Sequence, residues 1–238
     1  MGINMKIVMI HGQGHKGVTY TMSQCVLKYL KEEDTEVKEF FLTKDGPGFC
    51  VGCNSCFLKG EEACPEAAKV QPIMQAMEWA DVIMLDTPNY CMDMSGAMKT
   101  LLDHFGYRWV THRPHPSMFQ KVGITLSSSA GAPPNSTVKS LVKQLKWMCV
   151  PTVYTFGFVS NAMGIGDLSQ KKRQEMEVRA AKVAEKVRKA VLRKRVGMRT
   201  KMQFLLFRGM QMGEKSAWNP ADTEWWKKQG WLEKKKPW

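Results

Sequence analysis

A short apolar run in the middle of the chain, Val82–Asp86, constrains the fold more than any other feature. It shows no alternation of apolar and polar residues, which is typical of a strand buried on both faces. Pro88 ends the strand because proline cannot donate to a ladder. The loop that follows therefore lies at the carboxyl end of a central strand, the edge where open α/β sheets bind ligands. Ser95 is expected to cap the next helix, whose apolar stripe is Met98, Leu101, Leu102 and Phe105.

Four more apolar runs predict strands, and each of the five strands is followed by a segment with helical periodicity. Ser169 is expected to cap the last of these helices. This alternation favours a doubly wound parallel sheet, and the strand order 2-1-3-4-5 fits a chain of 238 residues. The predicted strands are Lys6–His11, Glu36–Leu42, Val82–Asp86, Val122–Leu126 and Thr152–Phe158.

The first strand runs into a glycine-rich loop, Gly12 to Gly17, whose spacing matches G-x-G-x-x-G. His15 and Lys16 place positive charge in this loop, and Thr19 offers a hydroxyl at the helix start. These features suit a terminal phosphate better than a pyrophosphate, which relies on close approach of glycine backbone. The alternative is a plain turn between strand and helix.

Small residues also follow the fourth strand, from Ser127 to Ala132. In the predicted strand order, the loops at 12–19, 87–96 and 127–132 lie side by side. One of them can bind phosphate, and the other two can hold a flat ring.

The net charge of +13 is concentrated at the end of the chain. From Lys186 onward, 15 Lys and Arg stand against 4 Asp and Glu, whereas residues 1–185 hold 20 against 18. A nucleic-acid role for the body therefore has no support in composition. No run of 18 apolar residues occurs, and the first apolar run is too short for a signal peptide, so we expect a cytoplasmic protein without a membrane span.

Four cysteines stand close together in the pattern C-x2-C-x2-C-x7-C-P. In a cytosolic chain such crowding favours metal or redox chemistry over disulfides. Three interpretations stay open: an iron–sulfur cluster of the [4Fe–4S] type, reduced thiols that shape the neighbouring loop, and a zinc site. Cys25 and Cys149 are expected in the core, and Cys91 either contacts a bound ring or packs. The four candidate ligands are Cys50, Cys53, Cys56 and Cys64.

These residues resemble the flavodoxin-like NAD(P)H-dependent FMN reductases, a family that includes the iron–sulfur flavoproteins. Residues 12–19 are similar to the family's phosphate loop G-S-P-R-x-x-G-N-T, although Gln13, Gly14 and His15 replace Ser, Pro and Arg. Residues 86–104 resemble its isoalloxazine loop, commonly P-x-Y before a small-residue turn and a K-x-x-x-D helix. Residues 127–131 are similar to its third flavin contact.

The resemblance implies an FMN-dependent oxidoreductase that takes hydride from NAD(P)H and reduces a quinone, a flavin or a similar small acceptor. In that case the flavin carries the chemistry and no side chain is named as catalytic. A second hypothesis is an iron–sulfur flavoprotein that exchanges electrons with ferredoxin, and a third is a binding module with an empty ligand edge. The implied FMN contacts are Gly12, Gln13, His15, Gly17, Thr19, Pro88, Asn89, Tyr90, Met94, Ser95, Gly96, Ser127, Ser128 and Gly131.

We expect a flavodoxin-like domain over 1–195 with a Cys-rich insertion at 49–65, followed by a basic extension over 196–238. His112 and Arg113 either meet the phosphate of NADPH or a substrate carboxylate, or belong to a solvated loop. The extension is rich in Trp, which disordered segments are not. We expect it to dock on a neighbouring subunit of a homo-oligomer; packing on its own body and capture of an anionic membrane or a partner are alternatives. Its tryptophans are Trp218, Trp225, Trp226, Trp231 and Trp238.

Overall fold

The computed structural model describes residues 5–213 and 219–238, and its centre is a parallel sheet of five strands in the order β2-β1-β3-β4-β5. The fold class and strand order predicted above are confirmed. β4 and β5 run further than predicted because they pair with each other over eight residues, and the second strand ends one residue early, where a short helix begins. The strands are β1 (Lys6–His11), β2 (Glu36–Phe41), β3 (Val82–Asp86), β4 (Val122–Ser129) and β5 (Thr152–Val159).

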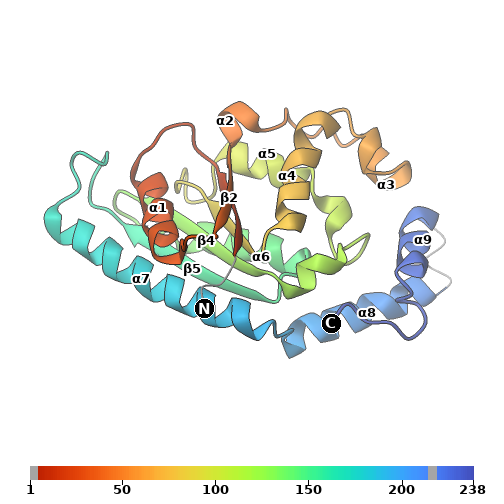
Figure 1. The fold of residues 1–238 in the computed structure, drawn as a ribbon. Helices are drawn as coiled ribbons and strands as arrows, with labels where there is room; N and C mark the ends of the chain where they lie inside the picture. Colours follow the sequence, from red (N-terminus) through yellow and green to blue (C-terminus); the bar gives the residue numbers. More distant parts are fainter. Residues whose placement is uncertain (1–4, 214–218) are drawn as a thin grey trace.

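Helices cover both faces of the sheet, which explains why every residue of β3 is buried (Figure 1). On one face, α1 (Val18–Leu30) and α7 (Gln170–Arg193) share a core with the strands. On the other face, the core is shared with α4 (Ala67–Trp79), α5 (Gly96–Asp103) and α6 (Asn135–Trp147). Short helices lie in the segments that connect these elements: the α-helices α2 (Leu42–Asp45) and α3 (Ser55–Leu58), and the 3-10 helices η1 (Glu61–Ala63), η2 (Gly106–Arg108) and η3 (Pro116–Gln120).

Both predicted helix caps are present. The Ser95 hydroxyl accepts a hydrogen bond from Met98 N–H at the start of α5, and Ser169 does the same for Lys172 N–H at the start of α7. Each hydroxyl satisfies one of the backbone donors that a helix start leaves without a partner. Ser95 therefore fixes the point at which the loop after β3 turns into helix.

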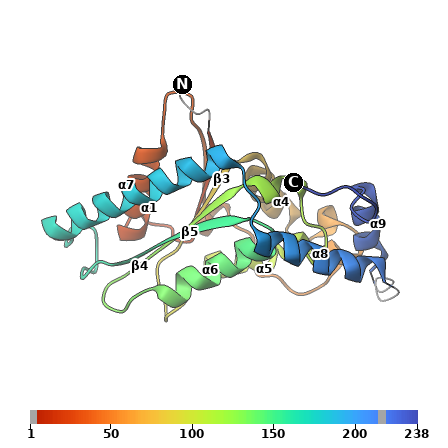
Figure 2. The same cartoon turned by 90° about the horizontal axis from the view of Figure 1, so that it is seen from below.

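The basic extension folds into two helices, α8 (Met198–Met212) and α9 (Pro220–Lys228), and packs on the body of its own chain (Figure 2). Phe204 and Trp226 are fully buried, with ring centroids 5.1 Å apart, and Trp231 meets Phe119 edge-on at 5.9 Å. The expectation that a neighbouring subunit covers these indoles is therefore corrected, because the chain itself already covers them. Trp218 lies outside the described residues. A homo-oligomer stays a prediction.

Among the helices of the described residues, none combines the length and the apolar character that crossing a bilayer requires. α8, the most apolar segment of the extension, has 15 residues, and three of them are Arg or Lys.

Candidate functional site

A cavity of about 660 Å³ opens at the carboxyl ends of the strands, a size within the range of roughly 300–1,000 Å³ found for small-molecule sites. The loops after β1, β3 and β4 surround it, as the strand order predicts. A fourth loop, residues 160–165 after β5, also lines it, and the sequence analysis missed this loop. Its run of Ser, Asn, Ala and Gly after a strand carried the same signal as the other three. The predicted residues that line the cavity are Gln13, His15, Gly17, Thr19, Pro88, Asn89, Tyr90 and Ser128.

Two of the other predicted contacts, Gly12 and Ser95, are buried and join the loops that surround the cavity. Gly12 N–H donates to the Asp86 carbonyl at 2.8 Å, and the Ser95 hydroxyl donates to the Gly12 carbonyl at 2.6 Å. A Cβ on Gly12 would lie only 2.8 Å from Ser95 Oγ, so the close approach of the two loops requires glycine. The predicted residues outside the lining are Gly12, Met94, Ser95, Gly96, Ser127 and Gly131.

A buried polar network lies beneath the cavity. His11 Nδ1 lies 2.6 Å from Asp86 Oδ2, and His11 Nε2 lies 2.9 Å from Glu39 Oε1. The second oxygen of Asp86 accepts a hydrogen bond from Gln13 Nε2 at 2.6 Å. Burial lowers the pKa of His11, but its hydrogen bonds to the carboxylates and their charges outweigh burial and raise the pKa above 6.5. The carboxylates of Asp86 and Glu39 therefore favour the protonated form of His11 over the neutral form.

Asp86 also fixes the orientation of the Gln13 amide. A carboxylate only accepts hydrogen bonds, so the Gln13 atom that faces it must be the nitrogen. Gln13 Oε1 is then a buried acceptor without a partner among the described residues, and Gln13 lines the cavity. A buried acceptor without a hydrogen bond lowers the stability of the folded protein, and a ligand that donates a hydrogen bond to it would remove this penalty. This supports a ligand with an N–H or O–H group near Gln13.

The start of α1 provides an anion site at the other side of the cavity. Within the described residues, no side-chain hydrogen bond caps this helix, and its N-cap Gly17 lines the cavity. The Thr19 hydroxyl is 2.6 Å from the Ser128 hydroxyl, which ties α1 to the end of β4. His15 and Lys16 are exposed beside it. Free backbone N–H groups and nearby cations are what a phosphate needs, so the residues fit the phosphate of FMN.

The loop after β3 presents an aromatic side chain at the rim of the cavity. Tyr90 is 51% exposed and lies in a tight turn in which its N–H and carbonyl pair with those of Asp93. Asn89 N–H donates to the Ser128 carbonyl at 2.9 Å, so the loop continues the pairing of β3 with β4. Cys91 in the same turn is exposed, so it does not pack in the core, and it is not among the residues that line the cavity. A flat ring could lie against Tyr90 and Pro88.

The Cys-rich segment lies apart from the cavity lining, beside α5 and α9. Cys50 and Cys53 are exposed, and Cys56 and Cys64 are half-buried. Burial raises the pKa of Cys56, and the charges of the other three thiols raise it further. Hydrogen bonds from Ser55 lower the pKa of Cys53. Within the described residues, no group of three or more Cys, His, Asp and Glu side chains is arranged to hold a metal ion.

Arg113 holds this segment in place. Its guanidinium is buried and donates to the carbonyl of Cys56 and, at 3.1 Å, to the carbonyl of Phe57. It also lies 3.5 Å from Asp222 of α9 and 3.5 Å from Glu61. A buried guanidinium with several acceptors at fixed positions acts as a rigid clamp. The C-terminal extension is thereby tied to the helix that carries Cys56.

Both interpretations of His112 and Arg113 made from the sequence are wrong. His112 Nδ1 lies 2.7 Å from Asp222 Oδ2, and the indole N–H of Trp226 donates to the His112 carbonyl at 2.6 Å. These residues are neither a solvated loop nor a cation open to substrate, because the extension covers them. The sequence could not show this, since Asp222 lies more than a hundred residues away.

Comparisons with known proteins agree with the fold. The model of the family described as NADPH-dependent FMN reductase matches residues 5–163. An iron–sulfur flavoprotein of Archaeoglobus fulgidus is 28% identical over 184 residues, which span 76% of this chain and 80% of that protein. An iron–sulfur flavoprotein of Methanocaldococcus jannaschii is 31% identical over 99 residues, 42% of this chain and half of that protein. The crystal structure of an azoreductase from Bacillus anthracis superposes with a TM-score of 0.60 at 17% identity, covering 76% of this chain and 99% of the other.

Proposed function

The chain belongs to the family of NADPH-dependent FMN reductases, and from this premise we propose that it passes electrons from NAD(P)H through FMN to a small acceptor such as a quinone or a free flavin. The observation that carries the proposal is the cavity itself. One side of it is the open start of α1, suited to phosphate, and another is formed by Pro88, Asn89 and Tyr90, suited to a flat ring.

Bound FMN supplies the redox chemistry, since it takes up a hydride and gives up electrons singly or in pairs. The chain's own residues bind and orient it. Backbone N–H groups at Gly17 and beyond, with Lys16 nearby, would hold the phosphate. Gln13 Oε1 would accept a hydrogen bond from the ligand, and Asp86 holds that amide in the required orientation. Tyr90, exposed at the rim, would cover one face of the ring and keep water from it.

Replacing Gly17 with Leu tests the placement of the phosphate. Gly17 has φ −87°, which any residue adopts, so the backbone tolerates the change. A Cβ there would meet the His15 ring at 2.9 Å, and the rest of the side chain would fill the phosphate site. We expect FMN affinity, measured by quenching of flavin fluorescence, to fall at least about a hundredfold, the order of magnitude of losing several charge-assisted hydrogen bonds.

Gly209→Leu is the matched control, because a Cβ at Gly209 meets nothing within 4 Å and Gly209 lies on α8. Circular dichroism checks the fold of both variants. If FMN binds equally to both, the phosphate does not lie at Gly17. If FMN does not bind the wild-type chain at all, the third hypothesis of an empty binding module gains support. Steady oxidation of NADPH or NADH by the FMN-loaded protein, with a quinone as acceptor, tests the electron path.

The Cys-rich segment favours a second candidate function, that of an electron carrier with an iron–sulfur cluster and ferredoxin as partner. Four thiols crowded into one short segment of the sequence could supply the donor set of such a cluster, and two relatives are named iron–sulfur flavoproteins. The described residues hold no preformed group of ligands, so the segment would have to close around a cluster. Gly52 and Gly60, both with positive φ, give the segment the backbone freedom to do so.

Anaerobic reconstitution with iron and sulfide tests this candidate. We expect broad visible absorption and bound iron in the wild-type protein, and loss of both when any of Cys50, Cys53, Cys56 and Cys64 is changed to Ala. Cys25→Ala and Cys149→Ala are the controls, since both thiols lie outside the segment and burial raises the pKa of each. Absence of iron from the anaerobic wild-type protein would remove the cluster and leave the flavin reductase.

A further inference from the structure

The helix α8 turns an apolar stripe away from the body of the protein. Phe204 and Thr200 face inward and are buried. On the opposite side, Met198 is 73% exposed, Met202 64% and Leu206 63%. The exposed positions recur every three or four residues, so they form one stripe along a helix about 22 Å long. The other exposed apolar side chains of α8 are Leu205, Met210 and Met212. An exposed apolar stripe of this length marks an interaction surface.

Cations border one side of this stripe. α8 and α6 form a groove whose apolar lining includes Met202, Leu206, Trp147 and Phe207. Its lining also includes the cations Lys139, Lys143, Lys146 and Arg199. The two helices lie next to each other on the same face of the molecule (Figure 2). Neither helix contains Asp or Glu, and together they carry six Lys and Arg: Lys139, Lys143, Lys146, Arg199, Lys201 and Arg208.

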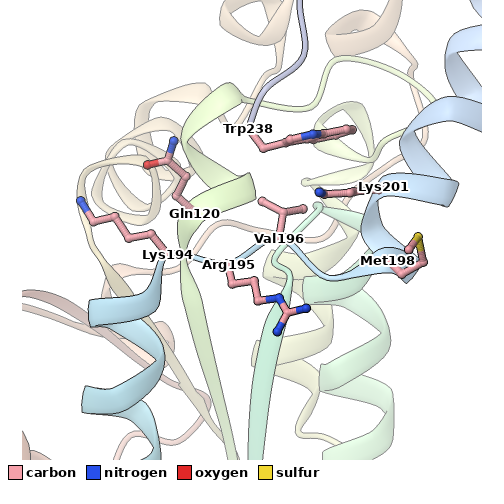
Figure 3. A pocket seen from close by; sticks show the side chains of 7 residues that line it. All are labelled: Gln120, Lys194, Arg195, Val196, Met198, Lys201 and Trp238. Atoms are coloured by element: carbon pink, nitrogen blue, oxygen red, sulfur yellow. The ribbon is translucent and has the colours of Figure 1, made fainter.

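Cations also border the other side of the stripe. Lys201 Nζ lies 5.4 Å from the centroid of the Trp238 ring, and Arg208 donates to the Glu233 carbonyl, so the last residues of the chain lie against α8. Lys234, Lys235 and Lys236 are exposed between these two anchors. Figure 3 shows Lys194, Arg195 and Lys201 around a cavity of about 460 Å³ next to Trp238. The apolar stripe thus has positive charge on both sides.

The charge decides which partner fits. A two-fold contact with a second copy of this chain would bring the same patch face to face and place like charges together. A nucleic acid would match the charge, but phosphates gain nothing from a row of Met and Leu. An anionic lipid bilayer offers both a negative surface and an apolar interior just below it. Flexible Met side chains can enter such a fluid phase without a partner of matching shape.

We propose that the outer face of α8, flanked by the cations of α6 and of residues 234–236, docks on an anionic membrane surface. α8 lies in the plane of the interface, its Met and Leu side chains enter the boundary between headgroups and acyl chains, and the lysines on both sides contact anionic headgroups. The protein is then bound at the membrane surface and does not cross the bilayer. This inference does not depend on the proposed redox function, because the surface lies outside the cavity lining that would hold FMN.

Co-sedimentation of the full-length protein with vesicles tests the proposal. One set of vesicles contains phosphatidylcholine alone, and the other contains phosphatidylglycerol as well. We expect binding to the anionic set only, and weaker binding as salt is added, because salt screens the attraction. Failure to bind anionic vesicles at low salt would overturn the proposal, as would equal binding to both sets.

One charge-reversal variant and one variant of an apolar residue, each with a control on α7, test where the membrane binds. Lys139→Glu with Lys143→Glu should weaken binding at least roughly 25-fold, because each cation near an anionic surface is worth about a fivefold factor. Leu206→Glu should weaken it at least about tenfold through the lost apolar contact. The controls are Lys182→Glu and Val178→Glu on α7, where Lys182 is exposed and Val178 is 49% exposed. Controls that weaken binding as much as the test variants would contradict the placement.

Two further measurements distinguish a membrane from the other possible partners of this surface, a second copy of the chain and an acidic protein. If Leu206→Glu abolishes self-association in sedimentation while vesicles never bind, the face is an interface between copies of this chain, and the membrane proposal is wrong. If soluble polyglutamate binds with the same dependence on Lys139 and Lys143 but vesicles do not, the partner is an acidic protein, and the proposal is again wrong. Unchanged melting temperatures of the variants ensure that loss of binding is not loss of fold.

Discussion

His11 Nδ1 and Asp86 Oδ2 lie 2.6 Å apart, and neither side chain is exposed. The pair joins β1 to the central strand β3 directly beneath the candidate FMN cavity. Glu39 from β2 contacts the other ring nitrogen at 2.9 Å, so one imidazole ties three strands together. Because Asp86 also holds Gln13, this charge pair connects the core of the sheet to the cavity wall.

Asp86→Asn should weaken both the fold and the site. The change keeps the size of the side chain but leaves a protonated His11 without its buried partner, which typically costs about 3–5 kcal/mol. It also replaces one of the two carboxylate oxygens with an amide NH2, so His11 and Gln13 no longer each face an acceptor oxygen, and FMN affinity should fall. Urea unfolding and flavin fluorescence titration measure the two effects. Asp103→Asn is the control, because Asp103 forms an exposed ion pair with Lys99 that is worth at most about 1 kcal/mol. Equal effects of the two variants would contradict the prediction.

The stability of the protein should depend on pH through His11. Its pKa in the folded protein is raised above 6.5, so the stabilisation from its protonated form is fully present below 6.5 and is lost as the pH rises through the folded pKa. The free energy of unfolding of the wild type should therefore exceed that of His11→Gln by more at about pH 6 than at about pH 9. A difference that is the same at both pH values would show that His11 does not titrate in this range.

Asp222→Ala should loosen the Cys-rich segment from a distance. The change leaves the buried Arg113 with one acidic neighbour fewer, so the guanidinium holds the carbonyls of Cys56 and Phe57 less firmly. We expect a loss of about 3–5 kcal/mol of stability and faster modification of Cys56 by a thiol reagent. Glu224→Ala, an exposed position on the same helix, is the control and should change neither. Unchanged reactivity of Cys56 would show that α9 does not position the segment.

Trp226→Ala should destabilise the monomer itself. The indole is fully buried against Phe204 and Trp231, and its N–H donates to the His112 carbonyl, so its loss should cost about 3–5 kcal/mol. Met210→Ala on the exposed side of α8 is the control, with an expected cost below about 0.5 kcal/mol. Sedimentation should show the same oligomeric state for both variants. A change of oligomeric state in Trp226→Ala without loss of stability would instead support the hypothesis that the extension contacts a neighbouring subunit.

Individual residues show how far prediction of the site could go. Gln13 and Gly17 line the cavity after the end of β1, and Ser128 lines it within the last residues of β4; a place at or near a strand end is visible in the sequence. Gly12 and Ser95 follow strand ends as well, but they are buried and bond to each other. Which residues of a loop face the ligand and which support the loop depends on neighbouring loops, and no periodicity encodes that.

The sequence by itself determined the parallel sheet, its strand order, two helix caps and three of the four loops at its ligand edge. These follow from apolar runs, small residues at strand ends and rules of chain connection, all of which act locally or through general topology. Only the tertiary structure decided that Asp222 meets Arg113, that Trp226 enters the core, and that the stripe of α8 faces outward. These outcomes depend on burial and charge pairing between residues far apart in the chain, because a local pattern shows that a side chain needs a partner but not which residue will supply it.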